Sequence, residues 1–207
     1  MRDQLLPNAN AAIPFLWICG PSGVGKSSVG WELFTQVRAA GVTAAYLDTD
    51  QIGFCRPEPQ DDPDHYLLRS RNVAALWPNF LAAGARAMIV SGILETPDGV
   101  RQFTAAVPGA SVTIVRLRAA PESLRERIFL RGQGGGPPIP GEQEQHGATT
   151  GRLLAHWQDS VATAEALAHN QIGDLCIDTD GRSVQEVAQA ILAQVPDWSR
   201  LRGPSAQ

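Results

Sequence analysis

One eight-residue stretch, GPSGVGKS at positions 20–27, constrains this chain more than any other feature. It matches the pattern G-x-x-x-x-G-K-[ST], whose glycines let the backbone turn so that successive N–H groups point at phosphate oxygens. The stretch follows an apolar run typical of a buried strand, FLWICG at 15–20, and it opens a segment with apolar residues at helical spacing, Val29, Leu33 and Val37. This context predicts a phosphate-binding loop, with a ligand-free glycine turn and a degenerate loop as the alternatives.

The residue types in this loop have separate chemical uses. Lys26 is the only lysine of the chain, beside sixteen arginines, and a compact ammonium fits between phosphates where a planar guanidinium does not. Ser27 offers a hydroxyl to Mg²⁺, and the helix that follows presents its positive N-terminal end to the same anion. We expect the phosphates to be held by the loop and its flank, that is by Gly20, Ser22, Gly23, Val24, Gly25, Lys26, Ser27 and Ser28.

Short apolar runs alternate with segments of helical spacing along the rest of the chain. The runs are TAAYLD at 43–48, AMIVSG at 87–92, VTIVRL at 112–117 and DLCID at 174–178. Two of the helices have clear signals, which are an apolar stripe of Leu124, Ile128 and Leu130 and a capping box of Ser183 and Glu186. Alternating strands and helices predict one α/β domain with a parallel sheet that is covered on both faces.

One stretch interrupts this alternation. GQGGGPPIPGEQEQHG, from Gly132 to Gly147, is too rich in glycine and proline to pack, and it predicts a mobile loop. Because a loop inserted in a compact domain is more often a lid than a linker, we expect a lid at about 132–148. The domain is expected to span 13–196, and the polar ends, 1–12 and 197–207, are expected to be flexible.

Two carboxylates follow the second apolar run, in LDTDQIG. Asp48 and Asp50 lie where parallel sheets bind ligands, at the carboxyl end of a strand. One carboxylate there can hold Mg²⁺ through its water shell, and the other can accept a proton from an attacking hydroxyl. The alternative is that Asp48 caps the strand and Asp50 caps the next turn.

Composition excludes several classes of protein. A net charge of −4 argues against a general nucleic-acid binder, which needs a basic field to attract phosphates. Guanine-reading GTPases use an Asn-Lys-x-Asp element, which a chain without a second lysine cannot contain.

The three separated cysteines fit a reducing compartment. The sequence shows neither a signal peptide nor an apolar stretch that could cross a membrane, so we expect a cytoplasmic protein. The four histidines have no metal-like spacing and are expected at the surface, and the oligomeric state stays open.

These motifs together resemble the small-molecule kinases with a phosphate loop, which include shikimate kinase, gluconate kinase and adenylylsulfate kinase. The resemblance covers about residues 14–196 and rests on GPSGVGKS, the DTD at 48–50, AMIVSG running into ILETPDGVRQF, the LRERIFLR helix and CIDTDGRSVQEVAQAI. It implies a three-layer α/β fold of the P-loop NTPase type, with five parallel strands in the order 2-3-1-4-5. It also implies ATP-dependent phosphoryl transfer to a hydroxyl of a small molecule, with ATP and Mg²⁺ bound. The alternatives are a nucleoside, nucleotide or polynucleotide-end kinase and, from another class, an ATP-binding switch with slow hydrolysis.

The resemblance also assigns roles near the acceptor. It implies that Asp48 joins Ser27 on the magnesium side and that Asp50 meets the acceptor hydroxyl. An arginine before the apolar helix that ends in Ala-Gly corresponds to Arg71, which would contact the acceptor, with Arg69 as the competing candidate. A solvated helix surface is the alternative for both arginines. The third strand ends in Val-Ser-Gly at 90–92, without the acidic residue that many phosphate-loop enzymes place there.

Further arginines are expected beside the nucleotide. Arg127 and Arg131 lie four residues apart, so both project from one face of a helix that leads into the expected lid. By resemblance they place positive charge over the transferring phosphate, and the alternative is a surface pair bridging to glutamates of the same helix. Arg182 lies in the turn DTDGRS, which is similar to the segment that borders adenine in these kinases.

Overall fold

Five parallel strands form one sheet with the order β2-β3-β1-β4-β5 in the computed structural model. The structure describes residues 12–55, 57, 60–62, 65–136, 146–195 and 198. The strands are β1 (Ile13–Cys19), β2 (Ala44–Asp48), β3 (Ala87–Ser91), β4 (Ala110–Arg118) and β5 (Leu175–Asp178). The helices are α1 (Lys26–Ala39), α2 (Tyr66–Ala82), α3 (Pro97–Ala105), α4 (Pro121–Gly132), α5 (Thr150–His169) and α6 (Val184–Gln194). The expected P-loop NTPase fold and strand order are confirmed.

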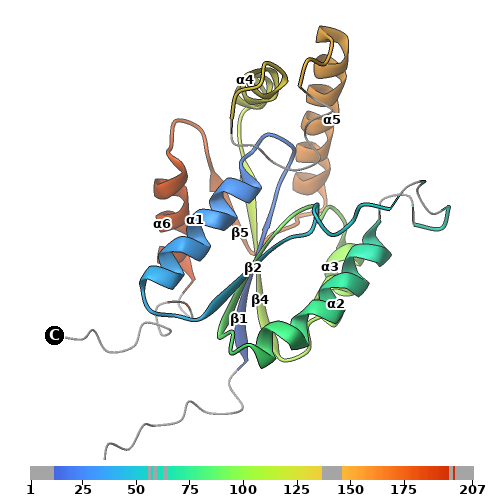
Figure 1. Ribbon diagram of the computed structural model, residues 1–207. Coiled ribbons are helices and arrows are strands. Elements are labelled where there is room, and N and C mark those ends of the chain that lie inside the picture. Colours follow the sequence, from blue (N-terminus) through green and yellow to red (C-terminus); the bar gives the residue numbers. More distant parts are fainter. Residues whose placement is uncertain are drawn as a thin grey trace, which may run out of the picture.

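The sheet is buried on both faces because its strands are apolar on both sides. Successive residues of β1 point alternately into two clusters: Leu16 and Ile18 pack under α1 and α6, whereas Phe15 and Trp17 pack under α2 and α3. Figure 1 shows these two helix pairs on opposite sides of the sheet. Helices α4 and α5 pack against each other at the end where the strands finish (Figure 1).

The register of the strands brings three chain segments to this end. Asp48 of β2 pairs with Ser91 of β3, and Ser91 also pairs with Ile18 of β1, one residue before the end of that strand. The Gly92 N–H donates to the Ile18 carbonyl at 3.1 Å, and the Thr49 N–H donates to the Ser91 carbonyl at 2.8 Å. The residues after β1, β2 and β3 therefore meet at one edge of the sheet, as expected for a ligand site in a parallel α/β fold.

Helix termini follow the local sequence. The capping box of Ser183 and Glu186 at the start of α6 is confirmed, and α4 starts at Pro121, where a proline suits the first turn. The expected apolar stripe of α4 is wrong at one position: Leu124 and Ile128 are buried, but Leu130 is 54 % exposed because it lies on the face toward a pocket described below.

Parts of the expected lid and ends lie outside the described residues, namely 137–145, 1–11, 196, 197 and 199–207. Trp198 is described, and it is buried among the residues under α1 and α6. Among the described residues, no helix combines the length and apolar character needed to span a membrane.

Candidate active site

The GPSGVGKS loop connects the end of β1 to the start of α1. Gly25 takes φ 102°, in the left-handed region that favours glycine, and this turn lets the helix begin at Lys26 with its N-terminal N–H groups facing the loop. The Lys26 ammonium donates a hydrogen bond to the Pro21 carbonyl at 3.1 Å, so its charge is held across the mouth of the loop. A loop that carries one ammonium and leads into a helix N-terminus suits an anion, because the first N–H groups of a helix have no partner within it.

Asp48 is tied directly to this loop. Its Oδ2 atom accepts hydrogen bonds from the Ser27 hydroxyl at 2.7 Å and from the Ser91 hydroxyl at 2.9 Å, and its side chain is buried. Ser91 is bonded in turn to the Tyr46 hydroxyl at 2.8 Å. Burial raises the pKa of Tyr46 to about 12, so its hydroxyl stays protonated as a donor. Ser91 and Tyr46 thus hold the Asp48 side chain, a role that the sequence did not indicate. Ser91 stands at the end of the third strand, where many phosphate-loop enzymes have an acidic residue.

Asp50 is joined to this network through its backbone. Its backbone N–H donates to Asp48 Oδ1 at 3.0 Å, and its own Oδ1 atom faces the Arg69 guanidinium at 3.8 Å. Within the described part of the chain this Oδ1 atom is shielded from solvent and has no hydrogen-bond partner. Burial and the charge of Asp48 raise the pKa of Asp50, although Lys26 and Arg69 act in the opposite direction. The site therefore contains a carboxylate with one free acceptor atom, close to the charge of Lys26.

The two candidate acceptor arginines lie on different faces of α2. Arg69 points inward and crosses Gly53, where an added Cβ would meet its Nε atom at 2.5 Å. Arg71 is exposed. Its neighbour Asn72 donates to the Ile52 carbonyl at 2.6 Å and so fastens α2 to the segment after β2. The structure brings Arg69, and not Arg71, to the aspartates.

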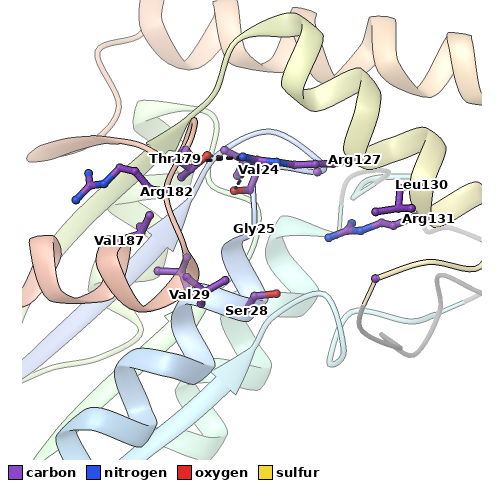
Figure 2. A pocket seen from close by; sticks show the side chains of 13 residues that line it. Val24, Gly25, Ser28, Val29, Arg127, Leu130, Arg131, Thr179, Arg182 and Val187 are labelled. Carbon is purple, nitrogen blue, oxygen red and sulfur yellow. Dashed lines mark hydrogen bonds between the residues drawn. The ribbon is translucent and has the colours of Figure 1, made fainter.

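A pocket of about 240 Å³ opens on the other side of the loop, between α1, α4 and the turn that leads into α6 (Figure 2). Its walls are mainly apolar, and its floor is the loop backbone at Gly23 and Gly25. The lining side chains are Val24, Ser28, Val29, Arg127, Leu130, Arg131, Thr179, Arg182, Val184 and Val187. A flat apolar group attached to a phosphate in the loop would fit this arrangement.

Arg127 and Arg131 both line this pocket from α4. Arg127 donates from Nη1 to Thr179 Oγ1 at 2.9 Å and from Nη2 to the Thr179 carbonyl at 3.1 Å, contacts that Figure 2 shows pointing toward the turn before α6. Arg131 lies one helical turn further on, and its charge acts on His156 of α5. Arg182 donates to the Asp178 and Glu186 carbonyls at the rim of the pocket.

Helix α5 contacts the loop through two residues that the sequence did not predict. His156 Nε2 lies 2.8 Å from the Ser22 hydroxyl, and the Ser160 hydroxyl donates to the Ser22 carbonyl at 2.7 Å. The expectation that all four histidines lie at the surface is wrong: His156 is partly buried in this contact, and His65 is buried before α2. The spacing of the histidines gave no signal for the contact of His156, because Ser22 is 134 residues away in the sequence.

A magnesium ion fits the residues present at one place. The described residues contain no group of three or more His, Cys, Asp or Glu side chains that could hold a metal. Ser27 and Asp48 supply a hydroxyl and a carboxylate, and Mg²⁺ is commonly bound by one or two protein oxygens together with substrate phosphates and water.

The three cysteines, Cys19, Cys55 and Cys176, are free.

The loop after β1, the strand order and the carboxylate at the end of β2 define a protein with the P-loop NTPase fold. A family model described as an AAA domain, AAA_33, matches residues 15–154, so the chain belongs to this family. No curated protein sequence matches the chain.

Several solved structures, two kinases among them, share this fold. The tunicamycin resistance protein of Deinococcus radiodurans is 22 % identical, with a TM-score of 0.54 over 88 % of this chain and 95 % of its own. A gluconokinase from Sinorhizobium meliloti 1021 is 19 % identical, with a TM-score of 0.54 over 91 % and 93 %. The APS kinase of Mycobacterium tuberculosis, solved with AMPPNP and APS, is 18 % identical, with a TM-score of 0.53 over 91 % and 98 %. The resemblance to P-loop small-molecule kinases is confirmed at the level of the fold.

Proposed function

We propose that this protein transfers the γ-phosphoryl group of ATP to a hydroxyl of a small molecule. The observation that carries the proposal is the different state of two carboxylates at one strand end. Asp48 is bonded to the loop serine, whereas Asp50 keeps an acceptor atom without a hydrogen-bond partner among the described residues. A kinase needs this division, because one carboxylate serves the metal and nucleotide and the other serves the attacking hydroxyl.

The nucleotide would run from the loop into the apolar pocket. The loop N–H groups and Lys26 would bind the β and γ phosphates. The base would lie against Val29 and Val187, with Arg127 and Arg182 at the border. Ser27 and Asp48 would hold Mg²⁺, which when bound neutralises charge on the phosphates.

The acceptor would enter on the side of Asp50 and Arg69. Asp50 orients the acceptor hydroxyl through its carboxylate, whose side chain is 37 % exposed, and accepts the proton of the hydroxyl as the new O–P bond forms. The bond between the γ phosphorus and the β–γ bridging oxygen breaks, and ADP leaves with the negative charge. Arg69 anchors a polar or anionic part of the acceptor, with Arg71 at the exposed rim of the same helix. Arg131 stabilises charge on the transferring group from the α4 side.

The relatives' names suggest which acceptors to try. The similar proteins include a gluconokinase, an APS kinase and a tunicamycin resistance protein, so sugar acids, sulfonucleotides and hydroxylated antibiotics are the first compounds to test. We propose a cytoplasmic protein, because free cysteines fit a reducing compartment, with ATP and this acceptor as its partners and no general affinity for nucleic acid.

The test is a screen for ADP release by the purified full chain with Mg²⁺ and ATP. The panel has two arms: small hydroxylated metabolites and antibiotics, and nucleosides with oligonucleotides. Lys26→Ala is the blank, and Lys26→Arg is the matched control, because it keeps the charge but not the compact ammonium. We expect one small acceptor to raise ADP release with the wild type alone. Stimulation only by the second arm favours a nucleoside or polynucleotide-end kinase, and nucleotide binding without any stimulation favours a switch.

A further inference from the structure

Helix α5 holds the phosphate-binding loop at a single residue. His156 and Ser160 lie one helical turn apart, and they reach the hydroxyl and the carbonyl of Ser22, respectively. These partners are 134 and 138 residues apart in the sequence. The hydroxyl and the carbonyl of Ser22 are therefore both bonded to α5. This helix supplies no residue to the apolar pocket.

Charged groups of both signs act on His156. Lys26 at the loop and Arg131 on α4 lower its pKa, and Asp159 on its own helix raises it. Burial is the largest influence, and the net effect is a pKa below the ordinary value, so the ring is neutral in the free protein near neutral pH. A triphosphate beside Lys26 and Arg131 would cancel the two positive charges that oppose protonation.

Protonation would fix the direction of the hydrogen bond to Ser22. A neutral imidazole carries one N–H, so Nε2 either donates to or accepts from the Ser22 hydroxyl, depending on the tautomer. A protonated imidazole can only donate, whichever tautomer preceded it. The Ser22 oxygen then has to accept, and its hydrogen turns away from the ring and can be donated elsewhere.

We infer that His156 is a positioning residue that takes up a proton from solvent when a triphosphate binds, and thereby turns the Ser22 hydroxyl toward the phosphates. This inference deepens the proposed function and rests on it. The proton comes from the buffer acid and forms a bond to the ring nitrogen, while Ser22 keeps its own hydrogen. Ser160 keeps the loop backbone in place during this change, because its bond goes to the Ser22 carbonyl.

The test is calorimetric titration of the full chain with AMPPNP and Mg²⁺ at pH about 7 in two buffers of different ionisation enthalpy. The difference in heat between the buffers gives the number of protons taken up. We expect proton uptake by the wild type to exceed that by His156→Gln by about half a proton at most. The amide of this variant can still bond to Ser22 but does not titrate. The affinity of the wild type should rise as the pH falls from 8 to 6, and that of His156→Gln should change less.

Two further variants separate this role from a structural one. Asp159→Asn leaves the contact intact but removes a charge that favours protonation, so its proton uptake should shift to lower pH. Ser160→Ala should weaken binding without changing the number of protons. Equal uptake by wild type and His156→Gln, or by wild type and Asp159→Asn at every pH, overturns the role of His156 and leaves the proposed kinase standing. No binding by the wild type overturns both.

Discussion

The Ser27 hydroxyl donates a hydrogen bond of 2.7 Å to the carboxylate of Asp48. Ser27 belongs to α1, the helix after β1, and Asp48 belongs to β2, and β3 lies between these two strands in the sheet. Ser91 of β3 bridges the gap, since its hydroxyl donates to the same Asp48 oxygen. The ends of β2 and β3 and the start of α1 are thus joined by one short network, in which the charged carboxylate of Asp48 accepts both hydroxyl bonds. This is where a divalent cation would be held against the phosphates.

Replacing that charge tests the magnesium site. Asp48→Asn keeps an oxygen that can accept from Ser27 but loses the negative charge, so we expect the Mg²⁺ concentration for half-maximal activity to rise about tenfold or more. Ser91→Ala is the control, because it removes one bond to Asp48 and keeps the charge, and it should have a smaller effect. Magnesium titrations of ADP release measure both. Equal magnesium requirements in the wild type and Asp48→Asn would remove Asp48 from this role.

Asp50→Asn should separate turnover from nucleotide binding. The carboxylate of Asp50 is proposed to take the acceptor's proton, so the variant should lose turnover by a factor of about 10²–10⁴ while its affinity for ATP changes little. Steady-state kinetics with the acceptor and direct nucleotide titration provide the two numbers. A parallel loss of affinity and turnover would contradict the assigned role.

The same substitution should stabilise the fold at neutral pH. Burial raises the pKa of Asp50 in the folded protein, so the folded state binds its proton more tightly than the unfolded state does. The stabilisation that this gives is complete below the unfolded pKa and is lost as the pH rises through the folded pKa. Asp50→Asn should therefore raise the melting temperature at pH 7 and make little difference near pH 3. Thermal unfolding at the two pH values decides this, and a lower melting temperature at pH 7 would show that the carboxylate stabilises the fold.

Arg69 and Arg71 form a matched pair on α2. Arg69 lies near Asp50, and Arg71 is exposed, so Arg69→Ala should raise the KM for the acceptor about tenfold to a hundredfold, as expected for loss of one charged contact. Arg71→Ala should leave this KM within about twofold. Kinetics with the acceptor found by the screen compare the two variants. A larger effect at Arg71 would place the acceptor at the outer face of the helix.

The strands and most helix ends could be predicted because their signals are local. Buried parallel strands are continuous apolar runs, and the capping box at Ser183 and Glu186 needs only neighbouring residues. The rotation of a helix is harder to predict. The resemblance favours Arg71 over Arg69 for the acceptor contact, yet Arg69 is the arginine beside Asp50. The apolar stripe likewise places Leu130 on the buried face of α4, where it does not lie. A shift of one or two residues around a helix decides between core, pocket and solvent.

The contacts that shape the candidate site have no local signal. His156 meets Ser22 across 134 residues, and Tyr46 reaches Ser91 across 45. Nothing in the residues beside a histidine or a serine indicates such a partner, so both pairs escaped sequence reasoning. The loop, Asp48 and Asp50 were found because short motifs place them at strand ends, and those ends meet by the rules of the fold.

Arg127 and Arg131 should affect different kinetic constants. Arg127 is bonded to Thr179 beside the pocket proposed for the base, so Arg127→Ala should raise the KM for ATP about tenfold, with a smaller loss of turnover. Arg131→Ala should lower kcat by a factor of about 10³, because its charge is proposed to stabilise the transferring phosphoryl group. Initial-rate kinetics at saturating acceptor measure both constants. The reverse pattern would exchange the two roles.

Gly92 supports the aspartates by leaving room for Thr49. Its φ is 148°, and an added Cβ would collide with the Thr49 hydroxyl, which is buried and bonded to the Ser91 carbonyl. Gly109 also has a positive φ, 79°, but an added Cβ there meets nothing within 4 Å. Gly109→Ala should therefore cost about 1 kcal/mol of folding stability from backbone strain alone, and Gly92→Ala should cost about 3 kcal/mol or more, since Thr49 has to move as well. Denaturant unfolding compares the stability of the two variants. Because Thr49 lies between Asp48 and Asp50, Gly92→Ala should also lose turnover. Equal losses of stability in the two variants, with normal activity, would show that the close approach of Gly92 to Thr49 has no role in holding the site.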